Sequence, residues 1–239
     1  MTVMKPINHI IDGGTPFLIL KSYLEAYSEY ISFLKLAWGS SLLDPEFMQK
    51  KKLCEALNII PILGGTFFEY CYHRDDLTLF TNKLLEYKME WVELSRGTVD
   101  IDNNKYCNIV SYYSDKFNVM SEIGRKCDDN SEQLTTKEWL DHSHLSLKAG
   151  ATIIVLESRE SGKVGIADNN GVINAHLIRN ITSEIDKDLI IFEAPLTNNQ
   201  SSLITNLGVD VNLGNIPIQG ILPVQALRNK LRSDTLLLE

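Results

Sequence analysis

The stretch NHIIDGGTP at residues 8–16 decides the fold class. Its apolar run predicts a β-strand at 8–12 that ends at Gly13 and Gly14. Thr15 followed by Pro16 is typical of a helix start, with an N-cap residue and a proline in the first turn, and we expect this helix to reach about residue 30. The stretch therefore predicts one strand-then-helix unit.

The same unit recurs along the chain of 239 residues. Further strands are expected at 31–36, 59–63, 91–94, 118–122, 153–157, 189–193 and 210–213. Further helices are expected at 45–56, 77–88, 107–116, 136–149, 175–185, 200–207 and 224–231. Strands that alternate with helices form a parallel sheet, because a parallel pair needs a long crossover connection.

Eight such units close most naturally into a (β/α)8 TIM barrel, here a single domain over residues 1–239. The rival architecture is an open doubly wound sheet, whose first strand-to-helix turn usually has the pattern GxGxxG. The first turn here reads Asp12-Gly13-Gly14-Thr15 and departs from that pattern. The barrel is therefore the favoured fold class.

Composition limits the class of partner. The formal net charge is −8, whereas proteins that coat nucleic acid are usually basic, so we expect no nucleic-acid partner. The chain has no run of about 18 apolar residues and its start lacks the pattern of a secretory signal, so we expect a cytoplasmic protein with no membrane partner. The four cysteines fit no zinc-site spacing and are expected to be reduced.

Charged residues follow most of the predicted strands, at the barrel end where active sites lie. The segments are KLAWG at 35–39, ELSRGT at 93–98, SEIGRK at 121–126, ESRESGK at 157–163 and FEAP at 192–195, and Glu69 follows the third strand. Clustered carboxylates need cations, which lysine, arginine or Mg²⁺ can supply. Lysine and arginine at the same mouth suit the phosphate and carboxylate groups of a small anionic substrate.

These segments carry a resemblance to a known family. The matching blocks are FLKLAWGS at 33–40, GGTFFE at 64–69, SEIGRK at 121–126, ESRESG at 157–162, FEAP at 192–195, VNLGNI at 211–216 and LRSDT at 231–235. In order and in combination they resemble the phosphosulfolactate synthase family over nearly the whole chain.

The resemblance implies a Mg²⁺-dependent addition of sulfite to phosphoenolpyruvate that gives (2R)-phospho-3-sulfolactate, a precursor of coenzyme M in some organisms and of other sulfonates elsewhere. Sulfite attacks the methylene carbon, the negative charge moves onto the carboxylate as an enediolate that Mg²⁺ stabilises, and an acid protonates C2. The family's proposed acid falls on Lys126. Cations beside this lysine are expected to lower its pKa toward neutrality.

On this basis the chain has three sets of candidate site residues. Lys126 is the expected proton donor. The expected metal ligands are Glu69, Glu122, Glu157 and Glu193. The expected substrate-binding residues are Lys35, Arg96, Arg125, Arg159, Lys163 and Asn212.

Two departures from the family pattern leave alternatives open. Arg96 stands where the family usually has an acidic residue, and Arg125 replaces the first lysine of a GKK segment. The first alternative is a related lyase that uses another sulfur nucleophile, or that eliminates a phosphate or sulfur group from another substrate. The second is a non-catalytic, stress-associated family member. We expect a homo-oligomer in either case.

Overall fold

Eight strands, all parallel, form one sheet in the order β3-β2-β1-β8-β7-β6-β5-β4. The computed structural model describes residues 6–126, 133–158, 161–168 and 170–238. The strands are β1 (Asn8–Asp12), β2 (Phe33–Leu36), β3 (Ile60–Leu63), β4 (Trp91–Leu94), β5 (Asn118–Ile123), β6 (Ile153–Leu156), β7 (Ile190–Glu193) and β8 (Leu213–Pro217). The edge strands β3 and β4 contact each other, so the sheet curls into a nearly closed barrel.

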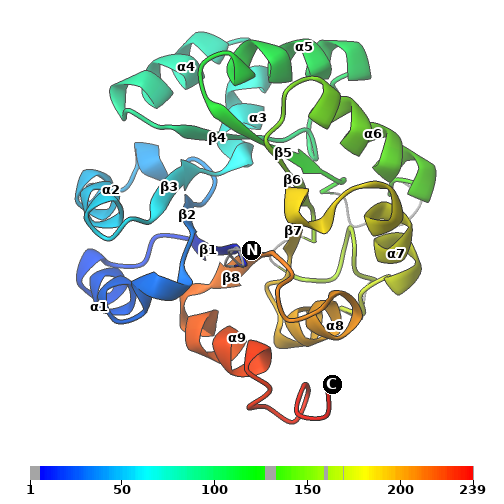
Figure 1. Cartoon of the computed structure of the whole chain (residues 1–239). Helices are drawn as coiled ribbons and strands as arrows, with labels where there is room; N and C mark the ends of the chain where they lie inside the picture. The colour runs from blue at the N-terminus through cyan, green and yellow to red at the C-terminus, as the bar shows by residue number, and fades with distance from the viewer. Residues whose placement is uncertain (1–5, 127–132, 159–160, 169, 239) are drawn as a thin grey trace.

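Helices surround this barrel as an outer ring, which Figure 1 shows along the barrel axis. Within the described residues they are α1 (Phe17–Tyr27), α2 (Phe47–Ala56), α3 (Gly65–His73), α4 (Leu77–Glu86), α5 (Asn103–Ser114), α6 (Thr136–Lys148), α7 (Ala175–Glu184), α8 (Thr197–Leu207) and α9 (Ile221–Arg228). The predicted (β/α)8 barrel is confirmed. No helix in the described ranges is long and apolar enough to cross a membrane.

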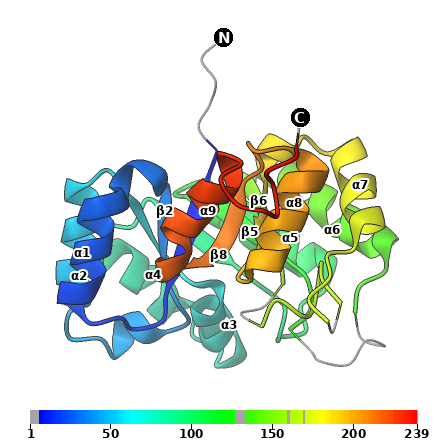
Figure 2. The same cartoon turned by 90° about the horizontal axis from the view of Figure 1, so that it is seen from below.

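Polar side chains fix where several of these helices begin. Asp76, Asp102 and Asn174 each accept a hydrogen bond from a backbone N–H in the first turn of α4, α5 and α7. Thr135 and Glu138 form a reciprocal capping box at the start of α6. Figure 2 shows the barrel from the side, with the strand-to-helix loops gathered at its lower end.

The differences between the predicted and the observed elements include the following three. The helix α3 was missed, because Gly64-Gly65 suggested only a turn, whereas the helix begins at Gly65 itself. The first helix begins at Phe17, so Pro16 occupies the cap position instead of the first turn. The last strand begins at Leu213, where the prediction ended it.

The barrel interior is divided into an apolar layer and a charged layer. The apolar layer is a separate cluster of buried side chains: Phe33, Ile62, Met120, Ile153, Val155 and Ile191. Side chains alternate between the two faces of a strand, so the residue two positions further along points into the barrel again. At β2, β5 and β7 that residue is Lys35, Glu122 and Glu193. The pleat of the sheet therefore places charged groups directly above the apolar layer.

Candidate active site

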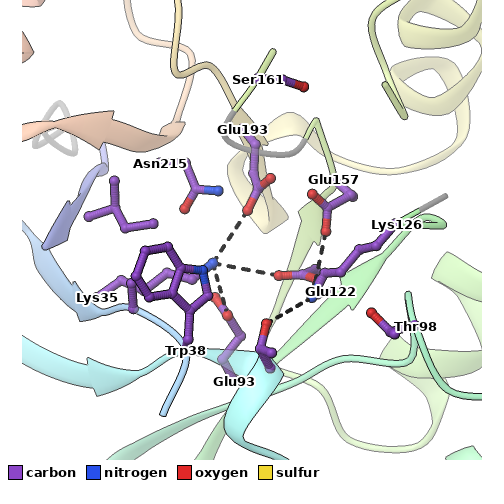
Figure 3. A pocket seen from close by; sticks show the side chains of 13 residues that line it. Lys35, Trp38, Glu93, Thr98, Glu122, Lys126, Glu157, Ser161, Glu193 and Asn215 are labelled. Carbon is purple, nitrogen blue, oxygen red and sulfur yellow. Dashed lines mark hydrogen bonds and ion pairs between the residues drawn. The ribbon is translucent and has the colours of Figure 1, made fainter. Parts of the chain in front are cut away.

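Lys35 lies at the centre of the charged layer. Its Nζ is 2.9 Å from Oε1 of Glu93, 3.3 Å from Oε1 of Glu193 and 3.5 Å from Oε2 of Glu122, as Figure 3 shows. Burial opposes the lysine charge, but the three carboxylates outweigh that effect and raise the Lys35 pKa well above its usual value. The side chain is therefore a fixed cation.

Lys126, on the loop after β5, is the second cation of the layer. Its Nζ is 2.8 Å from Oε1 of Glu122, 3.5 Å from Oε2 of Glu69 and 3.9 Å from Oε2 of Glu157. It also donates a hydrogen bond of 3.0 Å to Oγ of Ser95. Every one of these neighbours is buried.

The expected direction of the Lys126 pKa was wrong for the protein without bound ions. Burial lowers this pKa, but Glu122, Glu157 and Glu69 outweigh burial and raise it above its usual value. The prediction assumed that cations surround this lysine, whereas the described residues that touch it are carboxylates and hydroxyl groups. Lys126 therefore carries a proton throughout the neutral pH range.

The carboxylates of the site differ in how easily they ionise. Burial opposes ionisation of Glu122, yet Lys126 and Lys35 outweigh it and hold the Glu122 pKa below its usual range. Burial raises the pKa of Glu93 to about 7, although Lys35 acts in the opposite direction. Burial and then the charges of Glu122 and Glu193 raise the pKa of Glu157.

Three of these carboxylates could hold a metal ion. Glu122, Glu157 and Glu193 each offer an oxygen, and the three oxygens lie within 4.8 Å of one another. Burial and the neighbouring carboxylates raise the Glu157 pKa, and a divalent cation held by the three oxygens would favour the ionised form of this group. An oxygen-only, carboxylate-rich set suits Mg²⁺ better than zinc or copper.

Glu69 was expected to belong to this metal-binding set, but it has another contact pattern. Its Oε1 accepts hydrogen bonds from Oγ of Ser95 (2.8 Å) and from the backbone N–H of Thr98 (3.0 Å). Those contacts tie α3 to the loop after β4. Glu69 thus lies beside Lys126 and outside the three-carboxylate cluster.

A cavity of about 620 Å³ opens above the charged layer at the C-terminal ends of the strands. The lining residues include Lys35, Trp38, Glu93, Thr98, Glu122, Lys126, Glu157, Ser161, Glu193 and Asn215, all labelled in Figure 3. Trp38 is 44% exposed and has a left-handed backbone conformation, with φ of 54°. The cavity is therefore open to small polar molecules and carries both acids and bases.

Sequence comparisons identify the family to which this chain is related. The sequence model of the family described as (2R)-phospho-3-sulfolactate synthase (ComA) matches residues 4–234. The chain belongs to the (2R)-phospho-3-sulfolactate synthase family. The match includes every strand and helix of the barrel.

Two relatives in this synthase family align over nearly their whole length. The phosphosulfolactate synthase of Bacillus subtilis (strain 168) is 34% identical over 96% of this chain and 91% of the relative. The phosphosulfolactate synthase of Methanocaldococcus jannaschii is 32% identical over 95% of this chain and 92% of the relative. The family therefore places this chain among enzymes that are named for making phosphosulfolactate.

Solved structures at low identity support the fold alone. A 3-keto-L-gulonate-6-phosphate decarboxylase from Vibrio cholerae has a TM-score of 0.58 at 11% identity, covering 95% of this chain and 97% of that one. A phospho-2-dehydro-3-deoxyheptonate aldolase from Thermotoga maritima has a TM-score of 0.58 at 11% identity, covering 95% of this chain and 69% of that one.

The two arginines that depart from the family pattern are absent from the lining of the central cavity. Arg96 and Arg125 line a separate cavity of about 330 Å³ with His142. The Arg96 guanidinium stacks 4.5 Å above the Tyr106 ring and donates a 3.0 Å hydrogen bond to the carbonyl of Ile101. Arg96 therefore acts on the α5 side of its loop, away from the lysine and carboxylate groups.

Of two further predicted substrate contacts, the structure describes only one. Lys163 is exposed and absent from the cavity lining. Arg159 lies outside the described residues.

Asn212, an expected substrate-binding residue, is absent from the lining of the central cavity. Its Oδ1 accepts a 2.8 Å hydrogen bond from the backbone N–H of Ile7, and its Nδ2 donates to the carbonyl of Ile190 at 3.1 Å. Both partners lie at the N-terminal ends of strands, so Asn212 closes the barrel at the end opposite the cavity. The expectation followed from placing the last strand at 210–213, which put a residue that precedes the strand near its C-terminal end.

The cavity residues that were not among the predicted site residues include Glu93 and Asn215. Glu93 is a glutamate between apolar residues of β4. Because it lies two residues after Trp91, it is on the same face of the strand, and this spacing could have identified it as a residue that points into the barrel. Asn215 follows Gly214 inside the true last strand, and no periodic signal marks it.

Proposed function

We propose that this protein adds sulfite to phosphoenolpyruvate and forms (2R)-phospho-3-sulfolactate. One observation carries the proposal: at the barrel mouth of a chain in this family, one buried and one half-buried lysine face five buried carboxylates, three of which could hold one cation. The lysines are Lys35 and Lys126, and the carboxylates are Glu69, Glu93, Glu122, Glu157 and Glu193. The site thus has a lysine ammonium that can donate a proton and, beside it, carboxylates that could hold a cation to stabilise negative charge.

The chemistry needs one new bond and one proton. The sulfur lone pair of sulfite bonds to the methylene carbon of phosphoenolpyruvate, and the electrons of the carbon–carbon double bond move toward the carboxylate. A proton then adds to C2 and the phosphate ester is retained. Every atom of both substrates and one proton are found in the product.

The residues of this chain have separable roles in that sequence. The Lys126 ammonium is held at the mouth by buried Glu122 and Ser95, and we assign to it the proton that adds to C2. The Lys35 ammonium, fixed by three carboxylates, keeps positive charge below the substrate. Glu122, Glu157 and Glu193 would hold Mg²⁺, which when bound would draw off the negative charge that develops on the substrate carboxylate.

The alternative of another sulfur nucleophile depended on Arg96. That guanidinium is engaged by Tyr106 and the carbonyl of Ile101, beside a different cavity. The departure at residue 96 therefore gives no reason to change the nucleophile, and sulfite is retained in the proposal.

A ³¹P NMR time course of the purified protein with phosphoenolpyruvate, sulfite and Mg²⁺ tests the proposal. The expected result is a new phosphate-ester signal that requires protein, sulfite and Mg²⁺ together. Mass spectrometry should show the mass of phosphoenolpyruvate plus sulfurous acid. An unchanged phosphoenolpyruvate signal in the complete mixture would overturn the proposal.

A further inference from the structure

The last strand of the barrel contains a local irregularity. Asn8 of β1 is paired with Leu213, and Ile10 is paired with Ile216, so β8 advances by three residues where β1 advances by two. This is a β-bulge, which inserts one extra residue into a strand and redirects a side chain. The inserted residue lies between Leu213 and Ile216, at the C-terminal end of the barrel.

Asn215 is the residue that the bulge redirects. A Cβ on Gly214 would lie 2.7 Å from Cγ2 of Ile191 and 3.2 Å from Nδ1 of His9, so position 214 faces the barrel interior. In a regular strand the next residue would face the helices. Asn215 instead has φ of 51° and lines the central cavity. Asparagine is among the few residues that tolerate this left-handed conformation.

The Asn215 side chain is buried but has no internal partner. The residue is 4% exposed, and its Oδ1 has no hydrogen-bond partner among the described residues. Figure 3 shows the amide directed toward the cavity between Trp38 and Glu193. Oδ1 is an acceptor, whereas the Nδ2 of the same amide can donate its N–H groups to an anion bound in the cavity.

We propose that Asn215 is a substrate-contacting residue whose side-chain amide binds the phosphate group of the phosphorylated substrate. This rests on the proposed function for the identity of that substrate. The loops that follow strands seven and eight of an α/β barrel frequently form its phosphate site, and Asn215, within β8, lines the cavity on that side of the barrel. The amide can donate N–H groups to phosphate. Because it is neutral, it does not compete with Lys35 for the Glu193 carboxylate.

Replacing Asn215 by glycine separates this role from a purely structural one. Glycine adopts the left-handed conformation at least as readily, so Asn215→Gly keeps the bulge and removes the amide. Asn58→Gly is the matched control, because Asn58 has φ of 57° and is exposed in the turn after α2. The KM for phosphoenolpyruvate should rise about tenfold in Asn215→Gly, the usual scale for a lost hydrogen bond to a charged group. The KM should be unchanged in Asn58→Gly.

Inorganic phosphate is the probe for the group that is contacted. Its inhibition constant against phosphoenolpyruvate should rise in Asn215→Gly in parallel with the KM, whereas the KM for sulfite should stay constant. An unchanged phosphate inhibition constant would overturn the assignment to phosphate. An unchanged KM for phosphoenolpyruvate would overturn the substrate contact altogether.

Binding measured without turnover separates this inference from the proposed function. If the wild-type protein forms no sulfite adduct, the dissociation constant of phosphoenolpyruvate is measured by calorimetry for wild type and Asn215→Gly. Weaker binding by the variant supports the phosphate contact although the reaction differs. Equal binding, or no binding by the wild type, overturns it.

Discussion

At the scale of single residues, Lys35 is the cation that forms ion pairs with three buried carboxylates in the barrel interior. It is 6% exposed and contacts carboxylates from three different strands. Removing one partner from a buried ion cluster leaves the other charges unpaired. This lowers the stability of the folded state more than replacing the whole cluster by apolar residues would. The residue should therefore matter for stability as well as for binding.

Lys35→Met should lower the free energy of unfolding by about 3 kcal/mol or more, measured by urea denaturation. Lys21→Met is the control, because Lys21 forms only an exposed pair with Glu25 and should change stability by less than about 1 kcal/mol. Adding Glu93→Gln to Lys35→Met should restore part of the loss, since it removes one of the unpaired carboxylates. Equal stability of Lys35→Met and Lys21→Met would contradict this account of the charged layer.

His9 gives a second test at the residue scale. It is fully buried in the barrel, and burial and then the Lys35 charge hold its pKa well below the usual value. Below about pH 6.5 the unfolded chain binds a proton at this residue that the folded chain refuses, so folding stability should fall as the pH falls.

Replacing His9 by methionine should flatten that part of the pH profile by up to about 1.4 kcal/mol per pH unit. Urea denaturation of both proteins between pH 5 and pH 7 measures the difference, with the exposed His144→Met as control. Parallel profiles for wild type and His9→Met would show that the buried ring does not govern the acid sensitivity.

At the scale of elements, the loop after β4 and the loop after β5 are fitted to each other. The backbone N–H of Lys126 donates a 2.9 Å hydrogen bond to the carbonyl of Gly97. A Cβ on Gly97 would lie 2.7 Å from Cγ and 3.0 Å from Cδ of Lys126. A glycine at 97 thus allows the lysine stem to pass and reach the carboxylates.

Gly97→Ala should displace the Lys126 ammonium and lower kcat about 10²-fold, the scale expected for a misplacement of about 1 Å. Gly39→Ala is the matched control in the loop after β2, because its added Cβ would meet only an ordinary contact, 3.7 Å from Cδ2 of Phe67. Steady-state kinetics of both variants measures the effect. A kcat for Gly97→Ala equal to that of Gly39→Ala would contradict the positioning argument.

The sequence predicts those features of the elements that depend on local pattern. Alternating strands and helices gave the barrel, and charged residues after strands gave Lys35, Lys126 and the three carboxylates of the possible metal site. The raised pKa of Lys126 could not be predicted, because it depends on carboxylates that only the folded chain brings together. Asn215 could not be predicted either, because its direction is set by a bulge that breaks the strand period.

At the scale of the whole molecule, the barrel gathers acidic groups from distant parts of the chain into one buried site. Glu122, Glu157 and Glu193 come from successive strand-then-helix units, and a cation held among their oxygens would offset the repulsion between their charges. A cation that binds only the folded chain must therefore stabilise it.

Magnesium should raise the melting temperature of the protein by about 5 °C at saturating concentration, and removal by EDTA should reverse the shift. The shift should be lost in Glu193→Gln and retained in Glu184→Gln, whose carboxylate pairs with His144 on the surface. Differential scanning calorimetry measures all three proteins without any substrate. An identical Mg²⁺ shift in Glu193→Gln would place the cation elsewhere.

The most direct test of the central claim is the turnover of Lys126→Met in the ³¹P NMR assay with phosphoenolpyruvate, sulfite and Mg²⁺. Lys148→Met, an exposed lysine in the last turn of α6, is the control. If the Lys126 ammonium delivers the proton to C2, the rate of product formation should fall by about 10²–10⁴-fold in Lys126→Met and stay at the wild-type value in Lys148→Met. A wild-type rate in Lys126→Met would contradict the claim that this lysine, among its carboxylates, is the acid of the reaction.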